Sequence, residues 1–353
     1  MDYDGPQDSG SNDFSFEEPV PVSPAPVYIE RPRKKSPFRF LWRILFGLSI
    51  IGNFLMFVLL IGLAATTVLG TGHDGFFIEE TIVDGDSTNK IVVIRLEGII
   101  NGDMSDELRK QFRAVEKDTE VKAVIVRTIT PGGGVAASDQ IHHEISRLRS
   151  RTGKPVVAFM QTVAASGGYY TSVACDSIIA EPTVITGSIG VIMHHMVMKE
   201  LLEEKLGVRA VTIKSGEKKD WPSAFEETTE EQKKYLYDKL VLPAYGRFVD
   251  LVADGRADHL TYTEVKKLAD GSIYSAQEAM DVHLIDGIGY IEEAISVAEG
   301  LAGISGGKVV EYKRPFTFAN LMRAESMFGF SIDRDSLQEL TVPRLEYLWN
   351  PGL

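Results

Sequence analysis

Two glycine-rich turns in this sequence carry residue types that suit acyl-transfer chemistry. The first, "PGGG", places Gly132, Gly133 and Gly134 between an apolar run and a helical pattern. The second, "VAASGGYY", places Ser166 directly before Gly167 in the same context. Glycine lets backbone N–H groups approach a ligand, and the start of a helix adds partial positive charge. Such turns suit a developing oxyanion or a phosphate.

Ser166 allows two interpretations. At an elbow between a strand and a helix, its Oγ would point outward, and the Gly167 N–H could stabilise an oxyanion together with an amide of the first turn. Alternatively, the small residues only permit a tight packing corner. The GxSxG pattern of known elbows is absent around Ser166, and the first turn is neither GxGxxG nor GxxxxGK[ST]. A nucleotide site is therefore weakly supported, and both interpretations of Ser166 stay open.

Alternating strand and helix patterns must position these turns. Apolar runs rich in Val and Ile indicate buried strands, and the segments between them have helical periodicity. The expected elements are strands at 91–100, 121–128, 155–161, 176–181 and 208–214 and helices at 106–118, 135–149 and 228–256. The last helix is opened by a Thr N-cap with acids in its first turn. This alternation predicts a parallel α/β core.

The N-terminal part of the chain has a different character. Residues 1–30 carry seven acids and no Lys or Arg, and residues 31–43 carry six positive charges and no acid. We expect 1–43 to be a disordered cytoplasmic segment, because it offers little apolar surface to bury. Residues 44–70 lack charge and predict a transmembrane anchor, with the basic flank in the cytoplasm. A cleaved signal peptide is the alternative, but its apolar region would be only about 7–15 residues long.

Composition excludes several classes of protein. The formal net charge of −13 and the pI near 5.1 argue against nucleic-acid binding. One cysteine, Cys175, excludes an intramolecular disulfide and is expected to be a small core residue. The seven histidines show no HExxH spacing, so a zinc hydrolase has little support. We expect no metal and no other cofactor.

Four blocks of the sequence resemble the signal peptide peptidase A family of membrane-anchored serine proteases. They are "TPGGGVAASDQI", "VAASGGYYTSVACDSIIAEPTVITGSIGVI", "TIKSGEKKDW" and "AMDVHLIDGIG", in that order between about residues 90 and 300. The resemblance implies an α/β crotonase/Clp-protease-like fold of βαβ spiral turns. It also implies a homo-oligomer that cuts apolar peptides, such as cleaved signal peptides, with a Ser–Lys dyad.

The resemblance assigns roles to individual residues. Ser166 would be the nucleophile and Lys219, in "SGEKKD", the general base. Ser188, in "TGSIGV", would orient the lysine amine. Gly133, or a neighbouring glycine, and Gly167 would form the oxyanion hole. A lysine base must be shielded from water, because a solvent-exposed lysine, with a pKa of about 10.4, is almost fully protonated at pH 7.

The identity of the base is open from the residues alone. Lys218 and Lys214 lie near Lys219, and "EKKD" would ordinarily be a solvated loop. His194 and His195 offer a Ser–His–Asp alternative, in which Asp220 or Asp238 would be the third member. Otherwise the two histidines are surface or pocket-lining residues.

The sequence also predicts the boundaries between the parts of the chain. We expect a connector at 71–88, a peptidase domain at 89–303 and a C-terminal appendage at 304–353. The end of the chain, "TVPRLEYLWNPGL", has the alternation of an extended segment laid against a groove, and we expect it to dock on a neighbouring protomer or on its own core. A position near the catalytic face is a further hypothesis. Tyr169 and Tyr170 are expected to pack in the core, with a role in a subsite as the alternative.

The leading hypothesis is a single-pass serine endopeptidase of the cytoplasmic membrane, with its N-terminus in the cytoplasm and its catalytic domain outside. A crotonase-type acyl-CoA enzyme and a non-catalytic scaffold of the same fold are the alternatives. An extracytoplasmic location disfavours the first alternative, because coenzyme A is cytoplasmic. An intact set of Ser, Lys and Gly residues disfavours the second.

Overall fold

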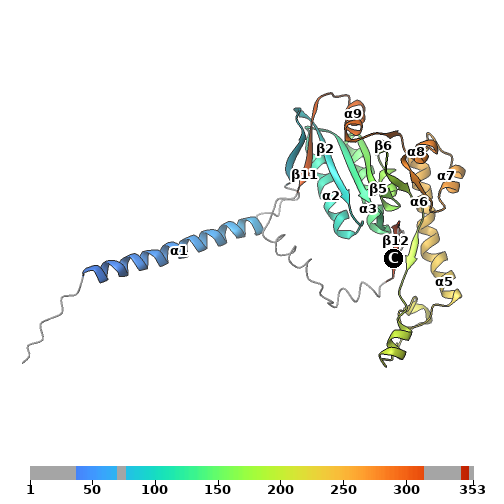
Figure 1. Ribbon diagram of the computed structural model, residues 1–353, viewed down its shortest axis with the longest axis horizontal. Helices are drawn as coiled ribbons and strands as arrows, with labels where there is room; N and C mark the ends of the chain where they lie inside the picture. The colour runs from blue at the N-terminus through green and yellow to red at the C-terminus, as the bar shows by residue number, and fades with distance from the viewer. Residues whose placement is uncertain (1–36, 70–76, 314–342, 350–353) are drawn as a thin grey trace, which may run out of the picture. The chain divides into compact units, whose positions relative to one another are not determined.

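The computed structural model describes residues 37–69, 77–313 and 343–349 (Figure 1). The chain divides into two compact units, residues 1–65 and residues 66–353, and each is described by itself. Residues 1–36, most of the segment predicted to be disordered, lie outside the described residues.

The first unit contains a long apolar helix, α1 (Pro37–Leu69). Within it, Phe40–Gly62 is apolar and long enough to cross a membrane, and none of it is buried. At about 1.5 Å per residue, these 23 residues span roughly 34 Å, close to the 30 Å hydrocarbon core of a bilayer. The helix begins seven residues before the predicted anchor of 44–70.

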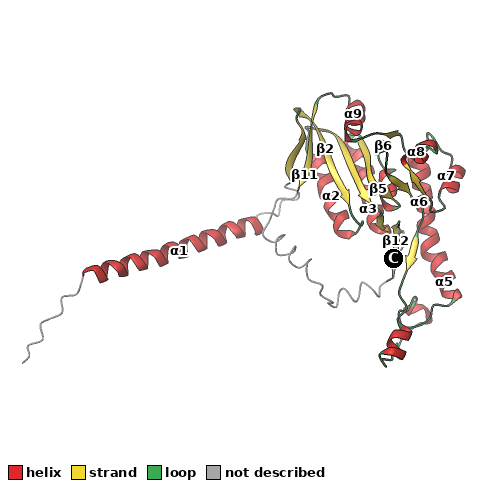
Figure 2. Cartoon of the chain, in the orientation of Figure 1, coloured by secondary structure: helices red, strands yellow, loops and turns green. Residues whose placement is uncertain are grey.

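The second unit is built on a mixed, mostly parallel sheet (Figure 2). Its order is β1-β11-β2-β3-β5-β6-β10, with β7 paired to β5 and to β9. The strands are β1 (Ile78–Val83), β2 (Asp86–Glu97), β3 (Val121–Thr130), β5 (Val156–Ala165), β6 (Ser177–Ala180), β7 (Ile185–Gly187), β9 (Ile273–Ser275), β10 (Gly287–Ile288) and β11 (Gly307–Lys313). A second, small sheet has the order β4-β12-β8, formed by β4 (Gly132–Gly134), β12 (Arg344–Leu348) and β8 (Ile192–His194).

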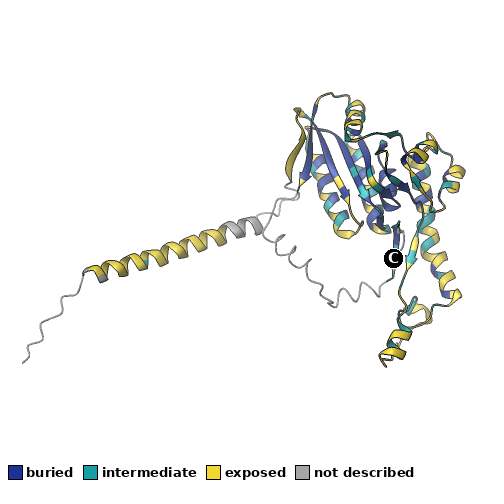
Figure 3. Cartoon of the chain, in the orientation of Figure 1, coloured by how far each residue is buried: buried dark blue, intermediate teal, exposed yellow. Residues whose placement is uncertain are grey.

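Helices lie on both faces of the main sheet and beside it (Figure 1). They are α2 (Gly102–Lys117), α3 (Val135–Thr152), α4 (Gly167–Ser172), α5 (Glu230–Leu236), α6 (Leu242–Gly255), α7 (Tyr262–Leu268), α8 (Ala276–Asp281) and α9 (Ile291–Ala302). Alternate residues of β2 enter two separate clusters. Val92 and Ile94 pack with α2 and α3, and Ile91 and Val93 pack with α9. This period of two gives a three-layer core whose central strands are buried (Figure 3). The α/β prediction is confirmed.

The sheet extends beyond the segment 89–303 expected from the sequence. β1 comes from the expected connector, and β11 comes from the start of the expected appendage. β11 lies between β1 and β2, parallel to β2, with Val309 opposite Ile91. Both segments are therefore parts of the α/β core.

Two other elements differ from expectation. The predicted strand 208–214 is wrong: this segment forms no strand and is exposed along its length, with Ile213 97% exposed. The predicted helix 228–256 is confirmed but interrupted. Thr229 caps α5 in a capping box with Gln232, and a π-turn at Tyr237–Val241 joins α5 to α6. Pro243 follows this turn, and proline removes a helix N–H and crowds the preceding turn.

Candidate active site

Ser166 occupies a strained elbow between β5 and α4. Its backbone has φ +52° and ψ −109°, a conformation that residues other than glycine rarely adopt. The Ser166 N–H donates to the Gly187 carbonyl at 2.8 Å, and the Tyr170 N–H donates to the Ser166 carbonyl at 2.8 Å. These bonds fix the elbow to β7 on one side and to α4 on the other. Strain maintained in this way is typical of nucleophile elbows.

The two glycine turns meet at this elbow. A Cβ on Gly167 would lie 2.7 Å from Ser138 Oγ, 3.1 Å from the Gly132 Cα and 3.2 Å from the Gly133 N. A side chain at position 167 would therefore collide with the first turn. The packing-corner interpretation is thus correct for this glycine. The same close approach brings the backbone of Gly133 next to that of Gly167, as an oxyanion hole requires.

The backbone carbonyl of Tyr347, in β12, lies next to the first glycine turn. β12 runs antiparallel to β4, with Tyr347 opposite Gly133 and Leu348 opposite Gly132. Gly132 has φ +104°, and a Cβ on it would lie 2.0 Å from the Tyr347 carbonyl oxygen and 2.7 Å from the Gly167 N. The Trp349 N–H donates to the Pro131 carbonyl at 2.8 Å. The edge of β4 therefore accepts an extended antiparallel chain beside the elbow.

Tyr347 anchors β12 in the core. Its side chain is 0% exposed, stacks on Tyr170 with ring centroids 4.7 Å apart, and lies 4.9 Å from the Phe248 ring. Its hydroxyl donates to the Ala244 carbonyl at 2.9 Å. The C-terminal segment thus lies at the predicted catalytic face and forms a fixed wall there.

A pocket of about 440 Å³ opens beside Ser166. It is lined by Ser166, Ser188, Gly190, Val191, Ile192, Tyr237, Val241, Tyr245, Ala269, Asp270, Gly271, Leu348 and Trp349. Ser188 is 8% exposed and also has a positive φ of +50°. Its N–H donates to the Ser272 carbonyl at 2.7 Å. The structure therefore brings the two predicted serines to one cavity.

The interrupted helix supplies residues that the sequence analysis missed. Tyr237 and Val241, at the two ends of the π-turn, and Tyr245, on α6, recur at intervals of four, and all three line the pocket. The Tyr245 hydroxyl donates to the Ala269 carbonyl at 2.9 Å, which joins the helix to the loop on the other side of the pocket. Pro243 inside the helical pattern was the available signal, because it marks a local change of helix geometry.

The predicted base lies elsewhere in the single chain. Lys219 is exposed, on a 3₁₀ turn (Glu217–Asp220), and it is not among the described residues that line the pocket. Lys218 lies over the rings of Trp221 and Tyr235, and Lys214 pairs with Asp220 at 2.9 Å. We call residues 196–228 the arm; Figure 1 shows it in yellow-green, beyond the start of α5. Within one chain, the nucleophile and the predicted lysine are not brought together.

The histidine alternative has no geometric support among the described residues. The His195 Nε2 lies 2.8 Å from the Thr228 Oγ1, and the His194 Nε2 lies 3.8 Å from a Glu346 carboxylate oxygen. Asp220 is engaged by Lys214, and Asp238 by Lys234. None of these side chains lines the Ser166 pocket.

The two tyrosines after the elbow are core residues, and so is Cys175. The Tyr169 hydroxyl donates to the Leu284 carbonyl at 2.8 Å, and the Tyr170 hydroxyl donates to Asp139 Oδ1 at 2.6 Å. Burial raises the pKa of both phenols and of the Cys175 thiol. These groups stay protonated at neutral pH and belong to the hydrophobic core on which the elbow packs.

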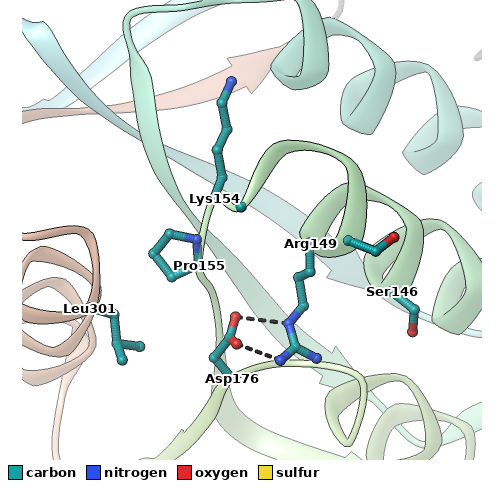
Figure 4. Close-up of a pocket in the computed structure, with 8 residues that line it drawn as sticks. Ser146, Arg149, Lys154, Pro155, Asp176 and Leu301 are labelled. Carbon is teal, nitrogen blue, oxygen red and sulfur yellow. Dashed lines mark hydrogen bonds and ion pairs between the residues drawn. The ribbon is translucent and has the colours of Figure 1, made fainter.

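A second hollow, of about 510 Å³, lies at the opposite, amino ends of the strands (Figure 4). Arg149 and Asp176 form an ion pair in its wall: the Arg149 Nε donates to Asp176 at 2.9 Å, and Asp176 also accepts the Val156 N–H. This ion pair holds α3 to the start of β5. Neither hollow holds a candidate metal site, because no group of three His, Cys, Asp or Glu residues suited to a metal occurs among residues 37–69, 77–313 and 343–349.

Comparisons with known proteins identify relatives of this chain. The model of peptidase family S49 matches residues 149–305. A protein of Enterococcus faecium named signal peptide peptidase SppA is 36% identical over 250 residues, covering 68% of this chain and 71% of that protein. A protease of Methanocaldococcus jannaschii is 41% identical over 198 residues, covering 56% of this chain and 62% of that protein. Protease 4 of Haemophilus influenzae is 36% identical, covering 60% of this chain and 35% of that protein.

Among solved structures, a point mutant of ClpP1 from Listeria monocytogenes is similar at a TM-score of 0.37 and 17% identity. That similarity covers 59% of this chain and 95% of that chain.

Proposed function

Because the chain belongs to peptidase family S49, we propose that it is a membrane-anchored serine endopeptidase with Ser166 as its nucleophile. The observation that carries this proposal is the strained Ser166 elbow packed against the glycine turn. The elbow places a hydroxyl beside a pocket, and the turn places the backbone of Gly133 next to that of Gly167.

The reaction follows from these positions. The Ser166 Oγ attacks a peptide carbonyl, its proton passes to Lys219 Nζ, and the N–H groups of Gly133 and Gly167 stabilise the oxyanion. The C–N bond then breaks, and the lysine ammonium returns the proton to the departing amine. Water, deprotonated by Lys219, hydrolyses the ester and frees Ser166. Ser188, inside the same pocket, would orient the lysine amine.

Assembly of several copies would complete the site. In one chain Lys219 is exposed on the arm, and a solvated ammonium is a poor base. The arm also exposes large apolar side chains, among them Val211 at 80% and Ile213 at 97%. We propose that a neighbouring copy covers the arm, shields Lys219 from water and brings it to a Ser166.

The substrates we propose are apolar peptides, such as cleaved signal peptides. Aromatic and aliphatic groups from the π-turn, α6, the segment after β7 and the end of β12 form most of the pocket wall, and such walls bind apolar side chains. The Enterococcus faecium relative is named for signal peptides.

The proposed location is the cytoplasmic membrane, crossed once by α1. The basic run at 31–43 would remain in the cytoplasm, and the second unit would lie on the outer side. Membrane attachment would place the enzyme where apolar peptides collect.

The test uses the full chain in detergent micelles or nanodiscs, with an apolar fluorogenic peptide and a fluorophosphonate probe. We expect hydrolysis, and covalent labelling at Ser166 located by mass spectrometry. Ser166→Ala removes both, and Ser146→Ala, at the second hollow, leaves both unchanged. Peptide hydrolysis that survives Ser166→Ala would overturn the assignment. An unlabelled Ser166 together with turnover of an acyl-CoA thioester would support the crotonase-type alternative.

A further inference from the structure

The pocket beside Ser166 contains a charge that an apolar substrate does not need. Among the described residues that line it, Asp270 is the one with an ionisable carboxylate, and none is a Lys, Arg or His. The remaining wall is aliphatic, aromatic, hydroxyl or glycine. A cavity with a largely apolar wall and a single anionic group suits a side chain with an apolar stem and a cationic end.

Asp270 is held in place by its own loop. Its Oδ1 accepts the Ser272 N–H at 2.9 Å. Hydrogen bonds from the Ser272 side chain and backbone lower the pKa of Asp270, so the carboxylate is charged at neutral pH. No Lys, Arg or His forms an ion pair with Asp270 in the part of the chain that the structure describes.

Asp270 is exposed and lines the cavity together with Tyr245. Burial raises the pKa of the Tyr245 phenol, and the charges of Tyr262, Tyr237 and Asp270 raise it further. Tyr245 lies on α6 and Asp270 on the loop before β9, so the two residues line the cavity from different elements.

The Asp270 loop is bonded to the nucleophile's own support. The Gly271 N–H donates to the Ile189 carbonyl at 3.2 Å, and the Ser188 N–H donates to the Ser272 carbonyl at 2.7 Å. Ser166 in turn donates its N–H to Gly187. A series of backbone hydrogen bonds therefore connects the Asp270 loop to the Ser166 elbow. A substrate side chain next to the attacked carbonyl would extend toward Asp270.

We propose that Asp270 is a specificity-determining residue that selects Lys or Arg in the substrate residue whose side chain fills the Ser166 pocket. This inference rests on the proposed peptidase function. The methylene stem would lie against Val241 and Tyr245, and the cationic end would pair with the carboxylate. Peptides that combine an apolar stretch with a basic residue next to the cleaved bond are the predicted substrate class.

The experiment measures kcat/KM for the full chain on a set of fluorogenic peptides. The set places Lys, Arg, Met, Leu or Glu in turn at each position flanking the cleaved bond, in one apolar background. At one position we expect wild type to prefer Lys and Arg over Met by about fivefold to tenfold, the range expected for a hydrogen-bonded charge at a partly open site. Glu at that position is the poorest substrate.

Asp270→Asn is the diagnostic variant, because an asparagine oxygen can still accept the Ser272 N–H and preserve the loop. We expect it to lose the preference for Lys and Arg while its kcat/KM on Met and Leu peptides stays within about twofold of wild type. Asp258→Asn, a matched change at an exposed aspartate outside the pocket, keeps the preference.

The outcomes separate the two proposals. If wild type cleaves Met and Lys peptides equally, or if Asp270→Asn retains the basic preference, the role of Asp270 is refuted and the peptidase function stands. If no peptide is cleaved and the fluorophosphonate fails to label Ser166, the peptidase function itself is refuted. Loss of cleavage of every peptide in Asp270→Asn, with an unchanged melting temperature, would also contradict a role confined to specificity.

Discussion

The Ser166 elbow and the arm differ in how completely the single chain determines them. The elbow is buried, bonded to β7 and α4, and closed by glycines that leave no room for a side chain. The arm pairs with no strand among the residues that the structure describes, and it exposes Ile213 almost fully. One half of the proposed dyad is thus preorganised by the fold of one chain, and the other half, in our proposal, needs a neighbouring copy.

Physical reasons explain this difference. The elbow is formed by residues close in sequence and by parallel strands that pair within the chain. The arm segment 208–214 has the β-branched composition of a strand, but a strand is stable only where a neighbour pairs with its backbone. Segment 208–214 of the arm therefore has the composition of a paired strand, but no strand in the described part of the chain pairs with it.

The largest expected effect concerns the arm. We expect Lys219→Met to lower peptide hydrolysis by about three orders of magnitude or more, because the proton of Ser166 would lose its acceptor. The melting temperature should not change, since Lys219 is exposed. The measurement is kcat/KM on the apolar peptide together with a thermal scan.

Lys218→Met is the matched control, because Lys218 lies on the same turn but contacts the rings of Trp221 and Tyr235. It should retain activity. An active Lys219→Met and an inactive Lys218→Met would reassign the base. Mixing inactive Ser166→Ala with inactive Lys219→Met restores hydrolysis if the serine and lysine of one site belong to different copies.

The second effect tests how strongly Tyr347 anchors β12 next to the Ser166 elbow. Tyr347→Ala should lower the free energy of unfolding by about 4 kcal/mol, the usual cost of removing a fully buried large aromatic side chain. Stacking on Tyr170 and the bond to Ala244 would be lost as well. Urea denaturation of the second unit, followed by tryptophan fluorescence, measures the change.

Tyr290→Ala, at a tyrosine that is largely exposed, provides the comparison and should cost less than about 0.5 kcal/mol. Equal stability losses in the two variants would show that β12 is not anchored through Tyr347.

The third effect is the pH dependence of the free energy of unfolding that His142 causes. Burial lowers the pKa of His142 to about 4, from an ordinary value of 6.5, and its ring meets Tyr170 edge-on. The unfolded chain therefore binds a proton between pH 6.5 and 4 that the folded chain does not. The stabilisation is complete above pH 6.5 and is lost as the pH falls toward 4. Between pH 7 and pH 5 this one group should account for about 2 kcal/mol of lost stability.

His142→Phe should reduce the loss of stability between pH 7 and pH 5 by about that amount, and His143→Phe, at the exposed neighbour, should not. Denaturation curves at the two pH values give the comparison. Parallel pH dependence in wild type and His142→Phe would contradict a buried neutral imidazole.

Much of the elbow side was predictable from sequence, because local patterns determine it. The glycine turns, Ser166 and the parallel strands follow from residue order, and the structure brings Ser166, Ser188, Gly133 and Gly167 together. These four residues follow the ends of the strands β3, β5 and β7. Their roles in catalysis remain predictions.

The remaining pocket residues were not predictable, because they depend on contacts distant in sequence. Tyr237 and Val241 enter the pocket through a π-turn, which shifts the helical register that a period of 3.6 residues would give. Asp270 reaches it through backbone bonds between its loop and the segment at Ser188. Only the folded chain shows such pairings.

The smallest effect on stability is expected in the arm. Ile213→Ser should change the free energy of unfolding of the single chain by less than about 0.5 kcal/mol, because the side chain makes almost no contact there. The same change should weaken assembly and, with it, hydrolysis, since the proposed neighbour would no longer bury this side chain. Sedimentation velocity and kcat/KM, each measured over a range of protein concentration, test this. Ile78→Ser, at a half-exposed position on the edge strand β1, is the control. If Ile213→Ser assembles and hydrolyses like wild type, the arm is not the surface that brings lysine and serine together.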